Sequence, residues 1–183
     1  MFARTKRLTL RPGWPEDAPA VARAVRHEEV VRMLARAPWP YRLADAHAFL
    51  SRPRGPEEAC FLILSHEGDY PRPIGSIGLA PDEDGHELGY WLTPEAWGRG
   101  YATEAGGAVV EIARHALRLK RLHSAHFTDN PASGRVLEKL GFRATGMVKG
   151  RYSAGRDTIA PCRLYELDLA AEADADDIRA MAA

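Results

Sequence analysis

The stretch Trp97-Gly98-Arg99-Gly100-Tyr101-Ala102-Thr103-Glu104-Ala105 organises the chain, because two glycines and an arginine stand directly before a run of helix-forming residues. Residues 88–92 are apolar and aromatic and predict a short strand that leads into this turn. The first N–H groups of a helix have no partner within the helix, and the helix dipole adds partial positive charge there. Glycine lets a ligand approach the backbone closely, and Arg99 carries a charge that suits phosphate. These features suggest a pyrophosphate-binding turn, but an ordinary strand-to-helix turn would use the same glycines.

The composition is that of a globular chain with no overall charge. The 183 residues contain 25 basic and 25 acidic side chains, and this length suits one domain with a substantial core. The balanced charge favours neither nucleic acid nor a membrane as partner, and no apolar run approaches the roughly 20 residues of a membrane span. The N-terminus lacks the apolar segment of a secretion signal, and Cys60 and Cys162 form no CxxC pair. We therefore expect a cytoplasmic protein with reduced cysteines, a disulfide between the two being the less favoured alternative.

Alternation and helical periodicity divide the chain into elements. Strands are predicted over residues 7–11, 59–65, 73–79, 86–92, 122–127, 143–152 and 161–169, and helices over residues 17–25, 28–34, 45–50, 101–117 and 131–140. Polar turns join the three middle strands into an antiparallel meander, whereas a helical crossover makes strand 122–127 parallel to strand 86–92. The predicted fold class is α+β (mixed α/β), with a mostly antiparallel sheet of about seven strands, one central parallel pair, and about four to five flanking helices. Residues 1–170 form one domain, followed by an acidic, alanine-rich C-terminal tail at 171–183.

Three motifs, in this order along the chain, resemble those of one superfamily. Residues 89–105 resemble the acetyl-CoA-binding motif of GNAT N-acetyltransferases, and residues 130–142 resemble the second motif of that superfamily. Residues 5–12 resemble the opening strand of its ribosomal-protein-alanine N-acetyltransferase-like branch. The resemblance spans about residues 4–169 and implies the GNAT fold. It has one visible departure, because Trp97 stands where the superfamily often has Gln or Arg.

The resemblance implies acetyl-CoA as co-substrate and no metal. The pantetheine arm would pair with the backbone of Leu92 and Thr93 and contact Asn130, and Ser133 would lie near the thiol. Asn130 would serve equally well as a helix cap, and Ser133 as a first-turn residue, so both interpretations stay open. The CoA pyrophosphate would be held by the backbone N–H groups of Gly98, Arg99, Gly100, Tyr101, Ala102 and Thr103.

The reaction implied by the resemblance is direct attack of an amine on the thioester, which needs a neutral amine, oxyanion stabilisation and a proton for the thiolate. Glu87 is the predicted base, directly or through water, and the rival interpretation is a solvent-facing carboxylate. His126 is a second candidate base, and water alone is a third. Ser133 is the predicted donor to the thiolate, with Tyr101 as its rival. A backbone N–H near Leu92 is the predicted oxyanion donor.

The predicted function is acetyl-CoA-dependent N-acetyl transfer to a primary amine, either a protein N-terminus or a small molecule. The alternative is a catalytically idle acyl-CoA-binding module that senses or recruits. Acceptor recognition is expected from the loop at residues 36–42, with Trp39 and Tyr41, and from the hairpin around residues 151–156. The sequence leaves a monomer and a homodimer equally open.

Overall fold

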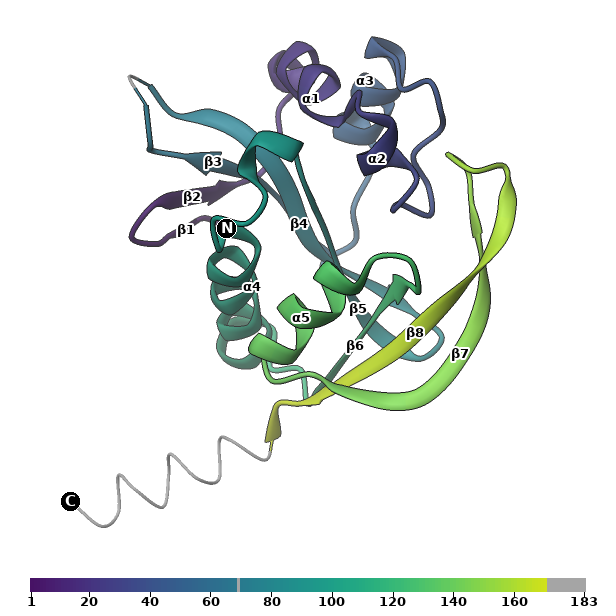
Figure 1. Ribbon diagram of the computed structural model, residues 1–183. Coiled ribbons are helices and arrows are strands. Elements are labelled where there is room, and N and C mark those ends of the chain that lie inside the picture. Colours follow the sequence, from purple (N-terminus) through teal and green to yellow (C-terminus); the bar gives the residue numbers. More distant parts are fainter. Residues whose placement is uncertain (69, 171–183) are drawn as a thin grey trace, which may run out of the picture.

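The structure is a computed structural model that describes residues 1–68 and 70–170, so the predicted C-terminal tail lies outside the described residues. Eight strands form one open sheet in the order β1-β2-β3-β4-β5-β6-β8-β7 (Figure 1). The strands are β1 (Ala3–Arg4), β2 (Leu8–Arg11), β3 (Ala59–Ser65), β4 (Arg72–Asp82), β5 (Gly85–Leu92), β6 (Arg121–Phe127), β7 (Arg143–Ser153) and β8 (Thr158–Asp168). The helices are α1 (Ala18–Val25), α2 (Glu28–Val31), α3 (Leu43–Ser51), α4 (Tyr101–Glu111) and α5 (Pro131–Lys139).

This architecture confirms the predicted fold class. The pairing is antiparallel throughout the described sheet except between β5 and β6, which run parallel. The eighth strand is β1, which adds two residues to the edge of the sheet beside β2 and is too short to show a periodic pattern. None of the described helices is long and apolar enough to cross a membrane.

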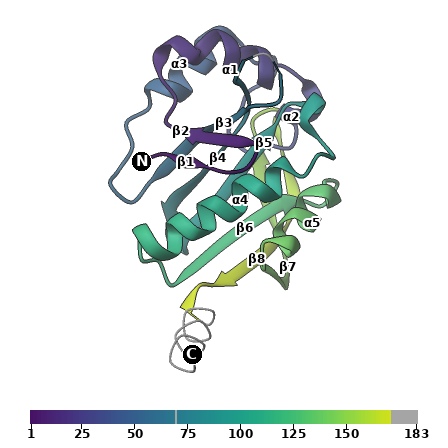
Figure 2. The same ribbon diagram turned by 90° about the vertical axis from the view of Figure 1, so that its left-hand side faces the viewer.

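Helices cover the sheet on both faces, and we name the faces after them. Helices α4 and α5 pack on one face, here the α4 face, over a core that includes Phe61, Ile63 and Val109 (Figure 2). Helices α1 and α3 pack on the other, here the α1 face, over Leu62 and Leu64. Successive side chains of β3 thus enter two different cores, which explains why that strand is apolar without alternation.

The parallel pair of strands separates soon after it forms. Only one registered pair, Glu87 with His123, joins β5 to β6, and each strand then continues along its other neighbour. Laterally paired residues share a face, so Glu87 and His123 lie on the same face and the next residues on the other. The separation leaves the carboxyl halves of both strands facing an opening, which is where ligand sites occur in parallel sheets.

Candidate active site

A cleft of about 1130 Å³ lies at this opening, and its walls come from both faces of the sheet. From the α4 face it is lined by Tyr90, Ser133 and the glycine turn, and from the α1 face by Glu87 and Arg151. The volume is that of a pocket for a sizeable ligand. The structure therefore brings the predicted catalytic residues Glu87 and Ser133 to one cleft from opposite sides of the sheet.

The glycine turn has the backbone geometry of an anion site. Gly98 and Gly100 adopt left-handed φ values of 70° and 79°, and helix α4 begins directly afterwards at Tyr101. No described atom lies within 4 Å of the position that a Cβ of Gly98 would take, so the backbone there is open to a ligand. The N–H groups of the first turn of α4 have no helical partners and carry the positive end of the helix dipole. The geometry of the turn is compatible with a pyrophosphate group, and its role in binding one stays a prediction.

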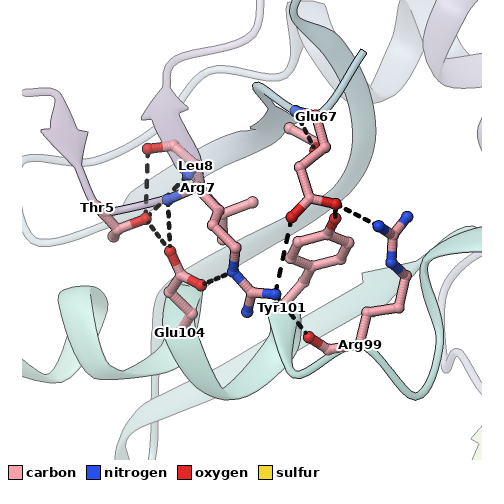
Figure 3. Close-up of polar contacts among 8 residues, drawn as sticks. Thr5, Arg7, Leu8, Glu67, Arg99, Tyr101 and Glu104 are labelled. Carbon is pink, nitrogen blue, oxygen red and sulfur yellow. Dashed lines mark hydrogen bonds and ion pairs between the residues drawn. The ribbon is translucent and has the colours of Figure 1, made fainter.

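A network behind the turn holds it in place (Figure 3). Arg7 donates to the carbonyl oxygen of Arg99 at 3.0 Å and to the carboxylate of Glu104 at 2.7 Å. Thr5 donates to the same carboxylate at 2.6 Å. Burial disfavours the Glu104 anion, but the hydrogen bonds from Thr5 and Arg7 outweigh it and lower the pKa of that carboxyl. The N-terminal segment thus fixes the start of α4, although the two regions are almost a hundred residues apart.

The side chains of Arg99 and Tyr101 point away from the cleft towards Glu67. Arg99 forms an ion pair with Glu67, and the Tyr101 hydroxyl donates to the same carboxylate at 2.5 Å (Figure 3). The guanidinium groups of Arg7 and Arg99 lie 4.6 Å and 5.1 Å from the centroid of the Tyr101 ring. The Arg99 side chain is paired with Glu67 and Arg99 does not line the cleft, so its charge is not directed to a ligand there. The Tyr101 hydroxyl is committed to Glu67 and not to Ser133.

At the end of β5 the structure separates two residues that were predicted to act together. The Trp97 indole donates to the Leu92 carbonyl oxygen at 2.9 Å, which leaves that oxygen a second lone pair. The Thr93 N–H donates to Ile74 of β4 at 2.8 Å, so it pairs within the sheet. Leu92 thus lines the cleft, whereas Thr93 does not. Trp97, at the position where the superfamily often has Gln or Arg, links the end of β5 to the glycine turn through its hydrogen bond to Leu92.

Tyr90 is the residue beside Ser133 that the sequence reasoning missed. Its hydroxyl, which has a single proton, lies 2.7 Å from Ser133 Oγ and 3.1 Å from the Ser133 carbonyl oxygen, so it can donate to either one. Burial raises the pKa of Tyr90 to about 12. Asn130 accepts a hydrogen bond from the Ser133 N–H at 3.3 Å, so the capping interpretation of Asn130 is confirmed. The sequence did contain one indication of Tyr90, because the alternation of side chains along β5 puts it on the α4 face together with Leu88.

Glu87 and Arg151 face each other on the α1 face of the cleft. The two guanidinium nitrogens of Arg151 donate to the two carboxylate oxygens of Glu87, with 2.8 Å between Nη2 and Oε2. The Glu87 side chain is 17% exposed and that of Arg151 35% exposed. The hydrogen bond with Glu87 raises the pKa of Arg151 against the opposing effect of burial, so Arg151 stays charged. The rival interpretation of Glu87 as a solvent-facing carboxylate does not describe this arrangement.

His126 lies on the other side of the sheet from Glu87. Its Nδ1 donates to the Phe127 carbonyl oxygen at 2.8 Å, and its ring packs 5.4 Å from that of Tyr165. Because Nδ1 carries this proton, Nε2 is the acceptor of the neutral ring, and it points at α5, only 2.7 Å from where a Cβ of Gly134 would be. The two candidate side-chain bases therefore face different parts of the cleft.

The cysteines and possible metal ligands make no site of their own. Cys60 and Cys162 are both free thiols, as predicted, and burial raises the pKa of Cys162. Among the described residues no group of three or more His, Cys, Asp or Glu side chains is arranged to hold a metal ion.

Comparisons with known proteins identify the family of this fold and site. The family model described as acetyltransferase (GNAT) domain matches residues 7–143. The uncharacterized N-acetyltransferase YoaA of Bacillus subtilis (strain 168) is 31% identical over 163 residues, which cover 79% of this chain and 84% of that protein. The structure resembles an acetyltransferase (GNAT family) from Bacillus anthracis with a TM-score of 0.78 at 23% identity, covering 92% of this chain and 99% of that chain. It also resembles RimL, a ribosomal L7/L12 alpha-N-protein acetyltransferase solved with coenzyme A, with a TM-score of 0.74 at 17% identity over 92% and 98% of the two chains.

The chain belongs to the GNAT family of acetyltransferases, as its motifs predicted. The protein is accordingly an acetyltransferase, and acetyl-CoA-dependent acetyl transfer is general for this fold.

Proposed function

We propose that the protein transfers an acetyl group from acetyl-CoA to a primary amine, carried by a protein N-terminus or a small molecule, through direct attack of the amine on the thioester. The observation that carries this proposal is the cleft between β5 and β6, which joins the glycine turn to Ser133 on the α4 face and to Glu87 on the α1 face. A donor can thus enter from one face of the sheet and an acceptor from the other.

Acetyl-CoA, the acetyl donor, is held by backbone groups more than by side chains. The N–H groups around Gly98, Gly100 and Tyr101 bind the pyrophosphate, and the free lone pair of the Leu92 carbonyl oxygen accepts from an amide of the pantetheine arm. Asn130 caps α5 and so fixes Ser133 beside the thiol. Bound acetyl-CoA supplies an activated acetyl group and a thiolate leaving group.

The amine loses its proton to Glu87, directly or through a water molecule. Both oxygens of Glu87 accept hydrogen bonds from Arg151, so this ion pair has to open or shift before an amine can use either oxygen. A backbone N–H near Leu92 donates to the thioester oxygen as negative charge develops there. These assignments follow the sequence prediction, with Arg151 added as the partner of the base.

The leaving thiolate is stabilised by the hydroxyl of Ser133, which Tyr90 supports. A tyrosine with a pKa of about 12 stays protonated at neutral pH and serves as a hydrogen-bond donor. When Tyr90 donates to Ser133 Oγ, the Ser133 proton is free to point at the sulfur. Ser133 is therefore the proposed proton donor to the leaving thiolate. The tyrosine that takes part is Tyr90, which supports Ser133, and not Tyr101, which the sequence reasoning considered as the rival donor.

A binding measurement and a turnover assay test the proposal together. Acetyl-CoA binding is measured by calorimetry, and thiol release from acetyl-CoA is followed with a panel of peptides and small amines. We expect Glu87→Gln to lower kcat about 100-fold or more and to leave the Kd for acetyl-CoA within about twofold, since a general base contributes 10²–10⁴-fold. Glu83→Gln, in an exposed turn, is the matched control.

The outcomes separate the proposal from its rival. Acetyl-CoA binding without turnover on any amine would support the idle acyl-CoA-binding module, and no binding would contradict both. A rate–pH profile that is the same in the wild type and in Glu87→Gln would remove Glu87 as the base and leave His126 or water.

A further inference from the structure

The ion pair between Glu87 and Arg151 puts a cation beside the proposed base, where a positively charged amine has to bind. An amine reaches the cleft mostly as a positively charged ammonium ion at neutral pH. Next to Glu87 it meets the Arg151 guanidinium, and two like charges a few ångströms apart repel. An acceptor with only positive charge therefore loses attraction at the point where its proton has to be taken.

Arg151 also has hydrogen-bonding capacity that Glu87 does not use. A guanidinium carries five N–H donors, and the contact with Glu87 engages one on each terminal nitrogen. No other hydrogen bond to its side chain occurs in the part of the chain that the structure describes. The side chain is 35% exposed and lines the cleft, so its remaining donors are open to a ligand. A guanidinium with free donors is suited to a carboxylate or a phosphate.

The end of the β7–β8 hairpin is fastened to the segment after α2, which fixes the position of Arg151. Ser153 Oγ donates to the Leu34 carbonyl oxygen and the Ala154 N–H to that of Ala35, both at 2.9 Å. Ser153 is fully buried and stands two residues after Arg151. Figure 1 shows the end of this hairpin reaching the segment that follows α2.

A second set of contacts fastens the same hairpin end. Arg156 donates to the Arg32 carbonyl oxygen at 2.7 Å and binds both carboxylate oxygens of Asp129, at 2.8 Å and 2.9 Å. Gly155 lies so close to Val31 that a Cβ there would be 2.5 Å from a methyl carbon. Arg151 is therefore held in place beside Glu87, and an acceptor that contacts both side chains must carry its amine and its anionic group close together, as a small molecule can.

From these contacts we infer that the acceptor is a small molecule that carries a carboxylate or a phosphate a few bonds from its amine. This inference rests on the proposed function and names its substrate class. The anionic group binds the free donors of Arg151, the amine binds Glu87, and the guanidinium–carboxylate pair opens as both charges gain new partners. The acceptor enters with no excess positive charge, which removes the repulsion that a simple amine would meet.

The test compares acceptors that differ in the anionic group alone. L-alanine is compared with L-alaninamide, and O-phosphoethanolamine with ethanolamine, so that the second member of each pair lacks the anionic group. The peptide Ala-Gly-Gly is included in the same thiol-release assay. The wild type is expected to give at least a tenfold higher kcat/KM with the anionic member of a pair. The amine of L-alaninamide is more acidic than that of L-alanine and hence more often neutral, so a preference for L-alanine cannot come from the amine itself.

Substitution of Arg151 completes the test. Arg151→Gln should remove the preference, mainly by raising the KM of the anionic acceptors about tenfold, and Arg151→Lys should restore part of it. Arg163→Gln, on an exposed position of β8, is the control that keeps the preference. Circular dichroism and the Kd for acetyl-CoA verify that each variant is folded.

Three outcomes would overturn the inference. The first is a wild-type preference for the amines that lack an anionic group, and the second is a preference for the peptide over L-alanine. The third is an equal loss of kcat/KM in Arg151→Gln for acceptors with and without the anionic group. Absence of turnover with every amine, in a protein that binds acetyl-CoA, would instead contradict the proposed function, so the two failures are distinguishable.

Discussion

The α4 face and the α1 face of the cleft are built in different ways. On the α4 face, one continuous stretch runs from β5 through the glycine turn into α4, and Arg7 and Glu67 brace it from behind. On the α1 face, the central contact joins Glu87 of β5 to Arg151 of β7, two strands that are not neighbours in the sheet. The glycine turn of the first face comes from one contiguous stretch of sequence, whereas the ion pair of the second face joins residues 64 positions apart. The difference suggests that donor binding is a fixed property of the fold and that acceptor choice depends on a few distant side chains.

Among changes to the α4 face, the largest effect is expected in the glycine turn, where the backbone is most constrained. Gly100→Ala forces a side chain into left-handed backbone, which costs about 1–2 kcal/mol, and places a methyl group 3.5 Å from the Arg7 guanidinium. We expect this cost to displace the backbone N–H groups of the turn and to raise the Kd for acetyl-CoA roughly 5- to 30-fold, as measured by calorimetry.

Gly107→Ala is the matched control for this change. Gly107 lies inside α4, and no described atom stands within 4 Å of its Cβ position. Alanine favours a helix over glycine by about 0.8–1 kcal/mol, so this variant should bind acetyl-CoA normally and be slightly more stable. Equal losses of binding in both variants would show that the turn has no special role in binding the anion.

A smaller effect is expected from Tyr90→Phe, which tests whether the two faces act separately. The substitution removes the hydrogen bond to Ser133, worth about 1 kcal/mol, so kcat should fall roughly fivefold to tenfold. The KM values for acetyl-CoA and for the amine should stay unchanged, because Tyr90 acts on the thiolate through Ser133 and not on binding. Tyr70→Phe, at a tyrosine that is 73% exposed, is the control.

A double-mutant cycle decides whether Tyr90 works through Ser133. If Tyr90 only orients that hydroxyl, Tyr90→Phe should have no further effect on kcat in a Ser133→Ala background. Additive losses would mean that Tyr90 contacts the reacting atoms itself, and equal changes in KM and kcat would indicate a structural role.

The same contrast explains how much the sequence could predict. The fold, the glycine turn and the Asn130 cap are encoded in contiguous residues whose spacing and backbone preferences are readable without a structure. Tyr90 stood inside the recognised motif, but its contact with Ser133 depends on how α5 is placed over β5. The commitment of the Thr93 N–H to Ile74 depends on the register between β4 and β5. Neither kind of contact leaves a local pattern.

The α1 face was the least predictable part. Glu87 was found as a carboxylate on the strand that enters the turn, but its ion pair needs β7 to return across the sheet beside β8. The hairpin around residues 151–156 was expected to take part in acceptor recognition, and that role stays a prediction. Its fixation by Leu34, Ala35 and Asp129 could not be seen from the sequence, since these partners come from two other segments of the chain.

The smallest effect is expected at Glu104, where the brace of the α4 face can be weakened by pH. Its carboxyl has a pKa below the ordinary value of about 4.3, so the folded chain binds the proton less readily than the unfolded chain. The resulting stabilisation is complete above about pH 5 and is lost as the pH falls through the lowered pKa. Glu104→Gln keeps the shape of the side chain without its charge and should lower the free energy of unfolding by about 1 kcal/mol at pH 6. In urea unfolding this difference should shrink towards pH 3, with Glu83→Gln showing no comparable change. A difference that is the same at both pH values would mean that ionisation of the Glu104 carboxyl does not contribute to holding the glycine turn against Thr5 and Arg7.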